Sequence, residues 1–459
     1  MKRFLLALGS LLMLAVSCNY FGMLDPDPDP ADNPDNPSTT DPDNPGTVDV
    51  KPSISVEYTV SDSLRINNGD FAAWAYDTTG MYGLIVANTL LRKCNGNNQS
   101  LGTAMAKESG KKAPEWGYWN YIIHYSSTDG AGEEVILSER VVFPAGFDFT
   151  HSPKGIALIS HPTIGAQRES PTIDKDFLIG LASLDYVTVF PDLMGFGVSR
   201  DRVHPYLCGE LTARQSIDGV LAALRFLDER GIAIQDGGGI VNVGYSQGGA
   251  SALAIHKYIE NSCTEEEKGF LDLKVSYCGG GPYDLVATWD AYKEAESLSV
   301  SCTLPMSVLA FKEAYPQEMN GIDPYDCLVE SLREADYLNK RILSKEYTVS
   351  LQSAHLKLVT GSTRMSAILS PAMMDQQSEL HATFRDLLER NSIASGWTPV
   401  KPVFFYHVKT DEVVPYVNME NALKGLAGSK VLTITGLSYT GGTHIGGAGA
   451  FYMQMMDEL

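Results

Sequence analysis

The sequence has few positive charges for its length. It contains 35 Lys and Arg residues against 56 Asp and Glu residues, so its formal net charge at pH 7 is −21. Proteins that bind nucleic acids neutralise phosphates with Lys and Arg, and this chain has an excess of the opposite sign. The charge balance therefore argues against a nucleic acid as a partner, although it does not identify a substrate.

The apolar run near the amino end is too short to cross a membrane. It extends from Phe4 to Val16, whereas a spanning helix needs about 20 apolar residues. It follows the positively charged start Met1-Lys2-Arg3 and ends beside the small residue Ser17, as secretory signals do. We therefore expect residues 1–17 to be a signal peptide.

The end of this segment, Leu14-Ala15-Val16-Ser17-Cys18, resembles the lipobox of bacterial lipoproteins. The resemblance implies that the signal is removed before Cys18 and that this cysteine carries lipid. The alternative is an ordinary secreted protein in which Cys18 is incidental.

The segment from Asp25 to Asp49 has no Lys or Arg but contains eight Asp and seven Pro. Such a composition has little apolar surface to bury and favours an extended, solvated chain. We predict that residues 18–50 form an acidic tether and residues 51–459 the folded body. The protein is then exported and attached to a membrane, expected to be the outer membrane, through its lipid alone. Acidic residues behind a lipidated cysteine also resemble the export signal of some surface-displayed lipoproteins.

The cysteines show no metal-ligand spacing, and we expect neither a metal nor a cofactor. Six remain after Cys18, and an even number in an exported chain permits three disulfides. Buried thiols are the alternative, because Cys278 ends an apolar run that reads as a strand. The six are Cys94, Cys208, Cys263, Cys278, Cys302 and Cys327.

Short apolar runs alternate with helical patterns from Gly155 onward, which predicts an α/β fold with a mostly parallel central sheet. Between Glu210 and Gly231, for example, apolar residues recur at spacings of three and four, as in a helix. The expected strands are 121–125, 135–143, 155–160, 186–190, 239–244, 273–278, 403–408 and 431–435.

The alternation is interrupted between about Leu285 and Met374 by segments that read as helices. They are 288–298, 304–314 and 326–343. An insertion here would lie over the carboxyl ends of the strands, where open α/β sheets bind ligands. We interpret it as a cap or lid over the binding site, and helices packed elsewhere as scaffold are the alternative. Met365, Met373 and Met374 could line an acyl site, but methionines at this spacing are more often core.

The pentapeptide Gly244-Tyr245-Ser246-Gln247-Gly248 lies between a predicted strand and a helix of small residues. In this context Gly-x-Ser-x-Gly is typical of a nucleophile elbow, a sharp turn that projects the serine above the end of a parallel sheet. Side chains at Gly244 and Gly248 would clash with the neighbouring strand and helix. Ser246 is therefore the predicted nucleophile.

A serine nucleophile needs a base and a carboxylate that orients the base. In α/β-hydrolases the order along the chain is Ser, then Asp or Glu, then His. Asp411 lies in the loop after the predicted strand 403–408, and Glu412 is the alternative acid. His444 is the one histidine that follows, in a glycine-rich loop. His407 lies within the strand, where we expect a structural role.

The oxyanion formed in acyl transfer needs two backbone N–H donors. The residue after the nucleophile, Gln247, should supply one. The loop after strand 155–160 should supply the other from Thr163, with Ile164 as the alternative. His161 precedes the nucleophile in the chain, so it is not the expected base and shapes this loop instead. No Lys follows the loop around Asp192 in P-loop spacing, so we interpret that loop as a tight turn under the site.

The motifs above and several longer segments occur along the chain in the order found in a known family. They are 160–163, 190–197, 204–206, 244–248, 279–285, 410–415 and the His444 loop, with 125–130 and 138–144 before them. Together they resemble the secretory lipase family of α/β-hydrolases, the lipase-A-like group. The resemblance covers roughly Trp116 to the C-terminus. It implies the α/β-hydrolase fold, a helical cap inserted before the acid strand, and hydrolysis of carboxylic esters.

The sequence therefore predicts a serine ester hydrolase that forms an acyl-enzyme on Ser246. The triad cannot distinguish an ester from an amide, so a serine peptidase or amidase is one alternative. A surface glycan-binding lipoprotein is the other, although a binder has no need to keep Ser246, Asp411 and His444 in order. Acylglycerols, acylated polysaccharides and small esters all stay open as substrates. Because the 285–374 region mixes charges with apolar residues, we favour an esterase on accessible substrates over an interfacial lipase.

Overall fold

The computed structural model describes residues 54–67, 117–144, 152–173, 186–426, 431–433 and 442–459. The chain divides into two compact units, Met1–Lys51 and Pro52–Leu459, and all described residues belong to the second. The predicted signal peptide, Cys18, the tether and Cys94 lie outside the described residues. Within the described ranges, no helix has both the length and the apolar character to span a membrane.

The described strands form one nine-stranded sheet in the order β1-β2-β3-β5-β4-β6-β7-β8-β9. The strands are β1 (Tyr58–Asn67), β2 (Gly117–Thr128), β3 (Glu134–Pro144), β4 (Gly155–Ser160), β5 (Tyr186–Pro191), β6 (Gly239–Tyr245), β7 (Leu273–Gly279), β8 (Val403–Tyr406) and β9 (Val431–Thr433). The pairs β1–β2, β2–β3 and β3–β5 are antiparallel, and the remaining pairs are parallel. The predicted α/β class with a mostly parallel sheet is confirmed.

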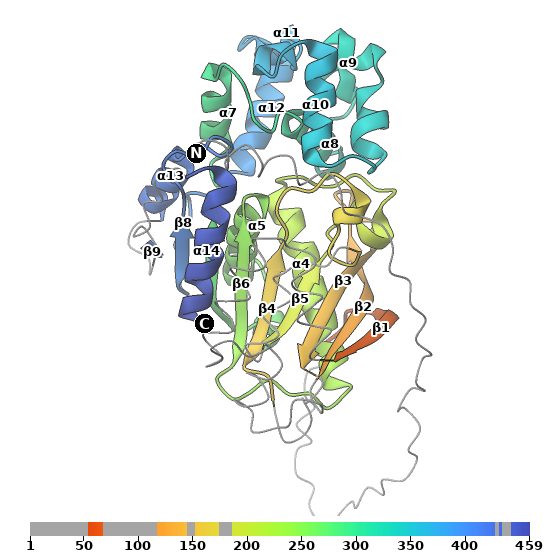
Figure 1. The fold of residues 1–459 in the computed structure, drawn as a ribbon, viewed down its shortest axis with the longest axis vertical. Coiled ribbons are helices and arrows are strands. Elements are labelled where there is room, and N and C mark those ends of the chain that lie inside the picture. Colours follow the sequence, from red (N-terminus) through yellow and green to blue (C-terminus); the bar gives the residue numbers. More distant parts are fainter. Residues whose placement is uncertain (1–53, 68–116, 145–151, 174–185, 427–430, 434–441) are drawn as a thin grey trace, which may run out of the picture. The chain divides into compact units, whose positions relative to one another are not determined.

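Helices cover both faces of this sheet (Figure 1). On one face lie α4 (Gly209–Asp228) and α5 (Gln247–Asn261), whose apolar residues share a core with β4, β5 and β6. On the other face lies α14 (His444–Glu458), whose Phe451 and Met455 belong to a second core. Since strand β4 is buried along its whole length, its continuous apolar sequence suits a position between the two layers.

The register of the parallel strands brings their carboxyl ends to one edge. Ser160 at the end of β4 is paired with Gly244 in β6, and Gly244 is paired with Cys278 in β7. Gly279, the last residue of β7, is paired with Tyr406, the last residue of β8. The loops that follow these four strands therefore begin close together.

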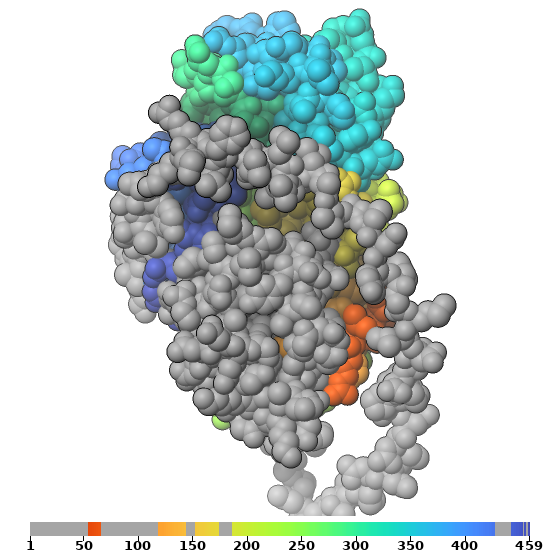
Figure 2. Space-filling model, in the orientation of Figure 1, coloured from red at the N-terminus to blue at the C-terminus, as the bar shows by residue number. Residues whose placement is uncertain are grey.

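The predicted helical insertion follows β7 (Figure 1). Its apolar residues form a separate core, to which Tyr206 and Cys208 also belong. The insertion contains α7 (Leu285–Glu294), α8 (Thr303–Ala314), α9 (Glu330–Glu334), the π-helix η7 (Leu338–Leu343), α10 (Val349–Thr360), α11 (Pro371–Met374) and α12 (Glu379–Arg390), with short 3-10 turns η6 (Pro324–Cys327) and η8 (Met365–Ala367). Figure 2 shows these helices packed as one continuous body, coloured green to blue. We call residues 285–390 the cap.

The cap differs from the prediction in two respects. It continues beyond Met374, because α12 packs its Phe384 and Leu387 into the same core. The predicted helix 326–343 is broken into η6, α9 and η7. Met365 and Met373 are fully buried in the cap core, which is the packing role that their spacing favoured.

Four shorter elements complete the described chain. They are α6 (Glu265–Phe270), α13 (Val417–Gly425), η3 (Gln167–Glu169) and η5 (Gly197–Ser199).

The cysteines of the described residues are free thiols rather than disulfides. All five are buried, and burial raises the pKa of Cys302 and Cys327 to about 12. They are distributed over two apolar cores, with Cys278 and Cys263 in the body and Cys208, Cys302 and Cys327 in the cap core. The disulfides that an even count permits are therefore absent among these five residues.

Candidate active site

Ser246 occupies a sharp turn between β6 and α5. Its backbone φ is 60° and its ψ is −124°, a left-handed conformation that residues with side chains rarely adopt. The two glycines of the pentapeptide permit the turn. A Cβ on Gly244 would lie 2.0 Å from the carbonyl oxygen of Gly248, and a Cβ on Gly248 would lie 2.2 Å from that of Ser160. The Ser246 amide donates to the carbonyl of Gly279 at 2.9 Å, which ties the turn to β7.

His444 lies between the serine and the predicted acid. Its Nε2 is 2.8 Å from Ser246 Oγ, and its Nδ1 is 2.7 Å from Asp411 Oδ2. The sequence predicted a loop here, but His444 is the first residue of α14, and Thr443 caps that helix by accepting from the Gly446 amide. The Tyr245 hydroxyl donates to the His444 carbonyl at 2.7 Å. The imidazole is therefore held by a helix start rather than by an irregular loop.

The Asp411 carboxylate is fully buried and accepts several hydrogen bonds. Its Oδ1 accepts from the amides of Val413 and Val414 at 2.9 and 2.8 Å, while its Oδ2 faces His444. Burial alone would raise the pKa of Asp411, but bonds to His407 and His444 outweigh it and hold the pKa well below its ordinary value. Asp411 is therefore ionised and oriented.

His407 lies just beyond β8, which ends at Tyr406, and not within the strand as predicted. The chain leaves the sheet there, and His407 Nε2 lies 2.9 Å from the Val414 carbonyl and 3.4 Å from Asp411 Oδ2. The side chain is fully buried, and it lies beside the same carboxylate oxygen of Asp411 that faces His444.

The alternative acid, Glu412, does not contact the imidazole. Its Oε2 accepts from the backbone amide of His444 at 3.0 Å, so it caps the first turn of α14. Of the two candidates, the structure places Asp411 against Nδ1.

The predicted oxyanion donors lie on two adjoining segments. Gln247 is the first residue of α5, where amides have no partner within the helix. Gly248 packs directly on the carbonyls of Ser160 and His161, which brings the loop containing Thr163 beside this helix start. In the part of the chain that the structure describes, the Gln247, Thr163 and Ile164 amides have no hydrogen-bond acceptor. Both alternatives for the second donor therefore stay open.

Two buried histidines lie behind these donors. His161 Nε2 is 3.0 Å from the Asp192 carbonyl, and its Nδ1 is 2.7 Å from that of Pro162. His204 was not predicted as a site residue, yet its Nε2 lies 2.7 Å from the side-chain amide of Gln247. The segment His204-Pro205-Tyr206 is part of the family resemblance, and that is the signal that could have identified it.

Asp192 lies under this region and is fully buried. Its carboxylate accepts from Ser138 Oγ at 2.6 Å and from the amide and hydroxyl of Thr172 at 2.8 and 2.5 Å. Burial raises its pKa to about 6, although these bonds and the charge of Arg140 oppose the rise. A Cβ on Gly197 would lie 1.9 Å from this carboxylate. The network fixes the 192–197 turn, which agrees with a tight turn rather than a ligand cradle.

The cap contacts both loops of the site. The Tyr292 hydroxyl of α7 donates to the Val413 carbonyl at 2.8 Å, beside the acid. The Gln352 side chain of α10 donates to the Gly165 carbonyl at 3.3 Å, on the loop after β4. The position of these loops therefore depends on the cap.

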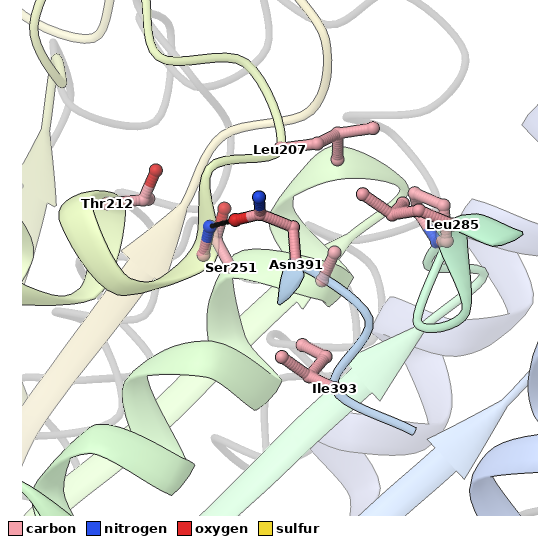
Figure 3. A pocket seen from close by; sticks show the side chains of 9 residues that line it. Leu207, Thr212, Ser251, Leu285, Asn391 and Ile393 are labelled. Carbon is pink, nitrogen blue, oxygen red and sulfur yellow. Dashed lines mark hydrogen bonds between the residues drawn. The ribbon is translucent and has the colours of Figure 1, made fainter. Parts of the chain in front are cut away.

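A small cavity lies beside the first turns of α4 and α5 (Figure 3). Its volume of about 10 Å³ has room for roughly one water molecule. Asn391 projects toward it and accepts from the Gly209 amide at 3.1 Å. The cavity is too small for an ester substrate.

Comparisons with known proteins agree with this architecture. The structure is similar to that of LipA, a rice cell wall degrading esterase from Xanthomonas oryzae, with 21% identity, a TM-score of 0.65, and coverage of 87% of this chain and 98% of LipA. It is also similar to lipase A of Candida antarctica, with 13% identity, a TM-score of 0.51, and coverage of 72% and 73%. No curated protein matches the chain. These likenesses show the α/β-hydrolase fold.

The sequence itself matches the model of the secretory lipase family over residues 169–440, which is more than half of the chain. That span includes the elbow, the cap and Asp411. The chain belongs to the secretory lipase family, whose members and structural relatives are hydrolases of ester bonds.

Proposed function

We propose that this protein is a serine carboxylic-ester hydrolase that forms an acyl-enzyme on Ser246. The observation that supports the proposal is the hydrogen-bonded series from Ser246 Oγ through both nitrogens of His444 to Asp411. A serine on a strained turn, an imidazole and a buried carboxylate in this order are what nucleophilic acyl transfer needs.

In the first step Ser246 Oγ attacks the ester carbonyl carbon while His444 Nε2 takes the hydroxyl proton. Asp411 accepts from Nδ1, which fixes the tautomer and stabilises the imidazolium. The negative oxygen of the tetrahedral intermediate is held by the amides of Gln247 and of Thr163 or Ile164. His444 then gives its proton to the leaving alcohol oxygen, and the acyl group stays on Ser246.

In the second step a water molecule attacks the acyl carbon while His444 again accepts a proton. The tetrahedral intermediate collapses, the acid is released, and the proton returns to Ser246 Oγ. His444 accepts and returns the proton in both steps, so the mechanism needs no metal or cofactor.

The substrate class is inferred from the contacts between the cap and the loops of the site. The cap is joined to the body by hydrogen bonds at both loops of the site, as at Tyr292 and Gln352, which suits a formed pocket for an accessible ester. LipA is a rice cell wall degrading esterase, so acylated polysaccharides belong among the substrates to be tested. We further propose export of the protein with a lipid on Cys18; incorporation of labelled palmitate that disappears in Cys18→Ala would support this anchor.

The central test is hydrolysis of 4-nitrophenyl esters from acetyl to palmitoyl by the purified protein and its Ser246→Ala variant. We expect wild-type turnover of short chains and a loss of at least about a thousandfold in the variant. Ser251→Ala is the matched control, because Ser251 is a buried serine one turn further along α5. Normal turnover by Ser246→Ala would overturn the assignment. A folded wild type without activity on any ester would favour an amidase or a binding protein.

A further inference from the structure

Helix α10 of the cap carries apolar side chains on its solvent side. Leu358 is 80% exposed and Leu351 is 39% exposed, whereas Gln352 on the opposite side is 1% exposed. Helix α12 of the same cap has the usual arrangement, since its Phe384 and Leu387 are buried in the cap core. A single exposed leucine is common in soluble proteins, but a helix that buries an amide and exposes leucines calls for an explanation.

The inward polar residues of α10 fix the rotation of the helix. The Gln352 side chain donates to the Gly165 carbonyl at 3.3 Å, and Ser353 Oγ accepts from the Cys302 amide at 3.3 Å. Both side chains are buried, so leaving them without partners would be costly. A rotation that brought Leu358 into the core would break these bonds. The leucines are therefore held on the outside.

The outward apolar residues form one continuous face. Leu351, Ala354 and Leu358 are separated by three and four positions, which places them on the same side of the helix, and all three are exposed. Lys357, which precedes Leu358, is exposed as well. In Figure 1, α10 lies in the cap beyond the carboxyl ends of the strands. We call Leu351, Ala354, Lys357 and Leu358 the outward face of α10.

The segment around this face is basic, although the chain as a whole is acidic. Residues 338–365 contain five Lys and Arg residues and one acid, Glu346, whereas the formal net charge of the chain is −21. Among the residues that the structure describes, neither Arg341 nor Lys357 has an ionic partner. Exposed leucines and unpaired positive charges therefore occur together here.

Aromatic rings connect Arg341 to the first turns of α10. The Arg341 guanidinium lies 4.7 Å from the centroid of the Tyr347 ring, and that ring lies 5.0 Å from the His355 ring of α10 in an edge-to-face arrangement. His355 is one turn beyond Leu351 on the helix, so the cation and the two rings adjoin the outward face. Tyrosine and arginine are side chains with an apolar body and a polar tip, which suits a boundary between water and an apolar phase.

We propose that the outward face of α10 docks on the surface of an anionic lipid membrane. In the docked state Leu351 and Leu358 enter the apolar side of the headgroup region, and Arg341 and Lys357 lie among the lipid phosphates. An acidic polysaccharide would supply the anions but no apolar phase for the leucines, and a neutral membrane would supply the reverse. The sequence predicted membrane contact through the lipid on Cys18 alone, and this face is a second contact that does not depend on the lipid.

The test is co-sedimentation with vesicles of phosphatidylcholine alone and with vesicles that also contain phosphatidylglycerol. The protein is the chain from residue 18 onward with Cys18→Ala, so neither the signal segment nor a lipid holds it on the vesicle. The compact unit Pro52–Leu459, to which all described residues belong, stays whole. We expect binding to the anionic vesicles, little binding to phosphatidylcholine alone, and a loss of binding as the salt concentration rises.

Variants on the outward face should weaken this binding. Leu358→Ser should lower the affinity for the anionic vesicles about tenfold, because it removes the largest exposed apolar side chain of the face. Lys357→Gln should lower it about fivefold, since one cation near the anionic surface is lost. Val400→Ser and Lys424→Gln are the matched controls, because they change the same residue types at exposed positions of the body. Both controls should bind like wild type.

Three results would overturn the proposal. One is a wild type that does not sediment with anionic vesicles, and another is an equal loss of binding in Val400→Ser and Leu358→Ser. The third is retention on polygalacturonate in place of vesicles that is lost in Lys357→Gln but kept in Leu358→Ser, which would assign the face to an acidic polysaccharide. Thermal unfolding checks the exposure itself: Leu358→Ser should leave Tm unchanged or raise it, and a clear fall would mean that this leucine is packed. None of these readouts depends on ester turnover, so they are separate from the test of the esterase function.

Discussion

The side-chain nitrogen of Gln247 lies 2.7 Å from Nε2 of His204, whose Nδ1 lies 2.9 Å from the carbonyl oxygen of Met194. Because that carbonyl can only accept, Nδ1 bears the hydrogen and Nε2 accepts from Gln247. Burial, and then the charges of His161 and Lys345, hold the pKa of His204 well below its ordinary value, so the ring is neutral. The side chain of Gln247, the residue after the nucleophile, is thereby held by a hydrogen bond to His204.

We predict that His204→Ala lowers kcat about tenfold or more with little change in KM. The ring does not contact Ser246, but its loss releases the residue whose amide holds the oxyanion, and small displacements of such donors are costly. Gln247→Leu should have the same effect, and the double variant should be no worse than either single variant. Steady-state kinetics on one short ester measures kcat and KM for the two single variants and the double variant. Additive losses would show that the two side chains act independently.

The choice of acid gives a second prediction. Asp411→Asn should lower kcat about ten thousandfold with the substrate affinity retained, because the amide cannot stabilise the imidazolium and favours the wrong tautomer. Glu412→Gln is the matched control, since the Glu412 carboxylate accepts from the backbone amide of His444 and not from its imidazole. It should keep activity within a few fold. A larger loss in Glu412→Gln than in Asp411→Asn would reverse the assignment of the acid.

The elbow glycines give a third prediction, on stability as well as activity. A Cβ on Gly248 would lie 2.2 Å from the carbonyl oxygen of Ser160, so Gly248→Ala forces α5 away from β4. We expect a loss of roughly 2 kcal/mol or more in the free energy of unfolding and a large loss of turnover. Gly269→Ala is the control, because a Cβ there meets nothing within 4 Å. Urea unfolding and ester hydrolysis measure both quantities; unchanged stability in Gly248→Ala would contradict the packing described for the turn.

Much of the site could be predicted from the sequence because its residues follow strand ends. Ser246 and Asp411 each come shortly after a recognisable apolar run, and parallel strands place such positions at one edge. The order of nucleophile, acid and base then indicated His444. The α/β class and most parallel strands were predictable for the same reason, since buried strands are continuous apolar runs.

The other parts of the site could not be predicted, because they depend on contacts between segments far apart in the sequence. The pattern of neighbouring residues does not indicate such contacts. His204 contacts Gln247, which lies 43 positions further along the chain, and the ammonium of Lys345 in the cap lies 4.5 Å from the ring centroid of Phe196 in the body. Lys345 belongs to no motif, and the segment 204–206 of the family resemblance does not itself indicate which residue His204 contacts. Strand β1 was missed because its sequence Tyr58–Asn67 is mixed and polar, as an exposed edge strand permits.

The last prediction concerns pH and the buried carboxylate of Asp192. Its pKa is about 6 in the folded protein against 3.8 for the ordinary side chain, mainly because of burial. A carboxyl whose pKa is raised by folding contributes stability below its unfolded pKa and loses that contribution as the pH rises through its folded pKa. This group should therefore lower the free energy of unfolding by about 2 kcal/mol between roughly pH 4 and pH 7.

Asp192→Asn removes this titration, so the stability of the variant relative to wild type should rise with pH over that window. Urea unfolding at half-unit steps from pH 4.5 to 7.5 measures the difference. The pKa of the neighbouring buried Glu139 is also raised, first by burial and then by the charge of Asp192, so the comparison rests on the difference between the two proteins. Asp290→Asn is the control, because a bond from Arg385 lowers the pKa of this exposed group and its contribution is complete above about pH 4.5. A constant difference between Asp192→Asn and wild type across the series would mean that the Asp192 carboxyl is ionised throughout, with its three hydrogen bonds outweighing its burial.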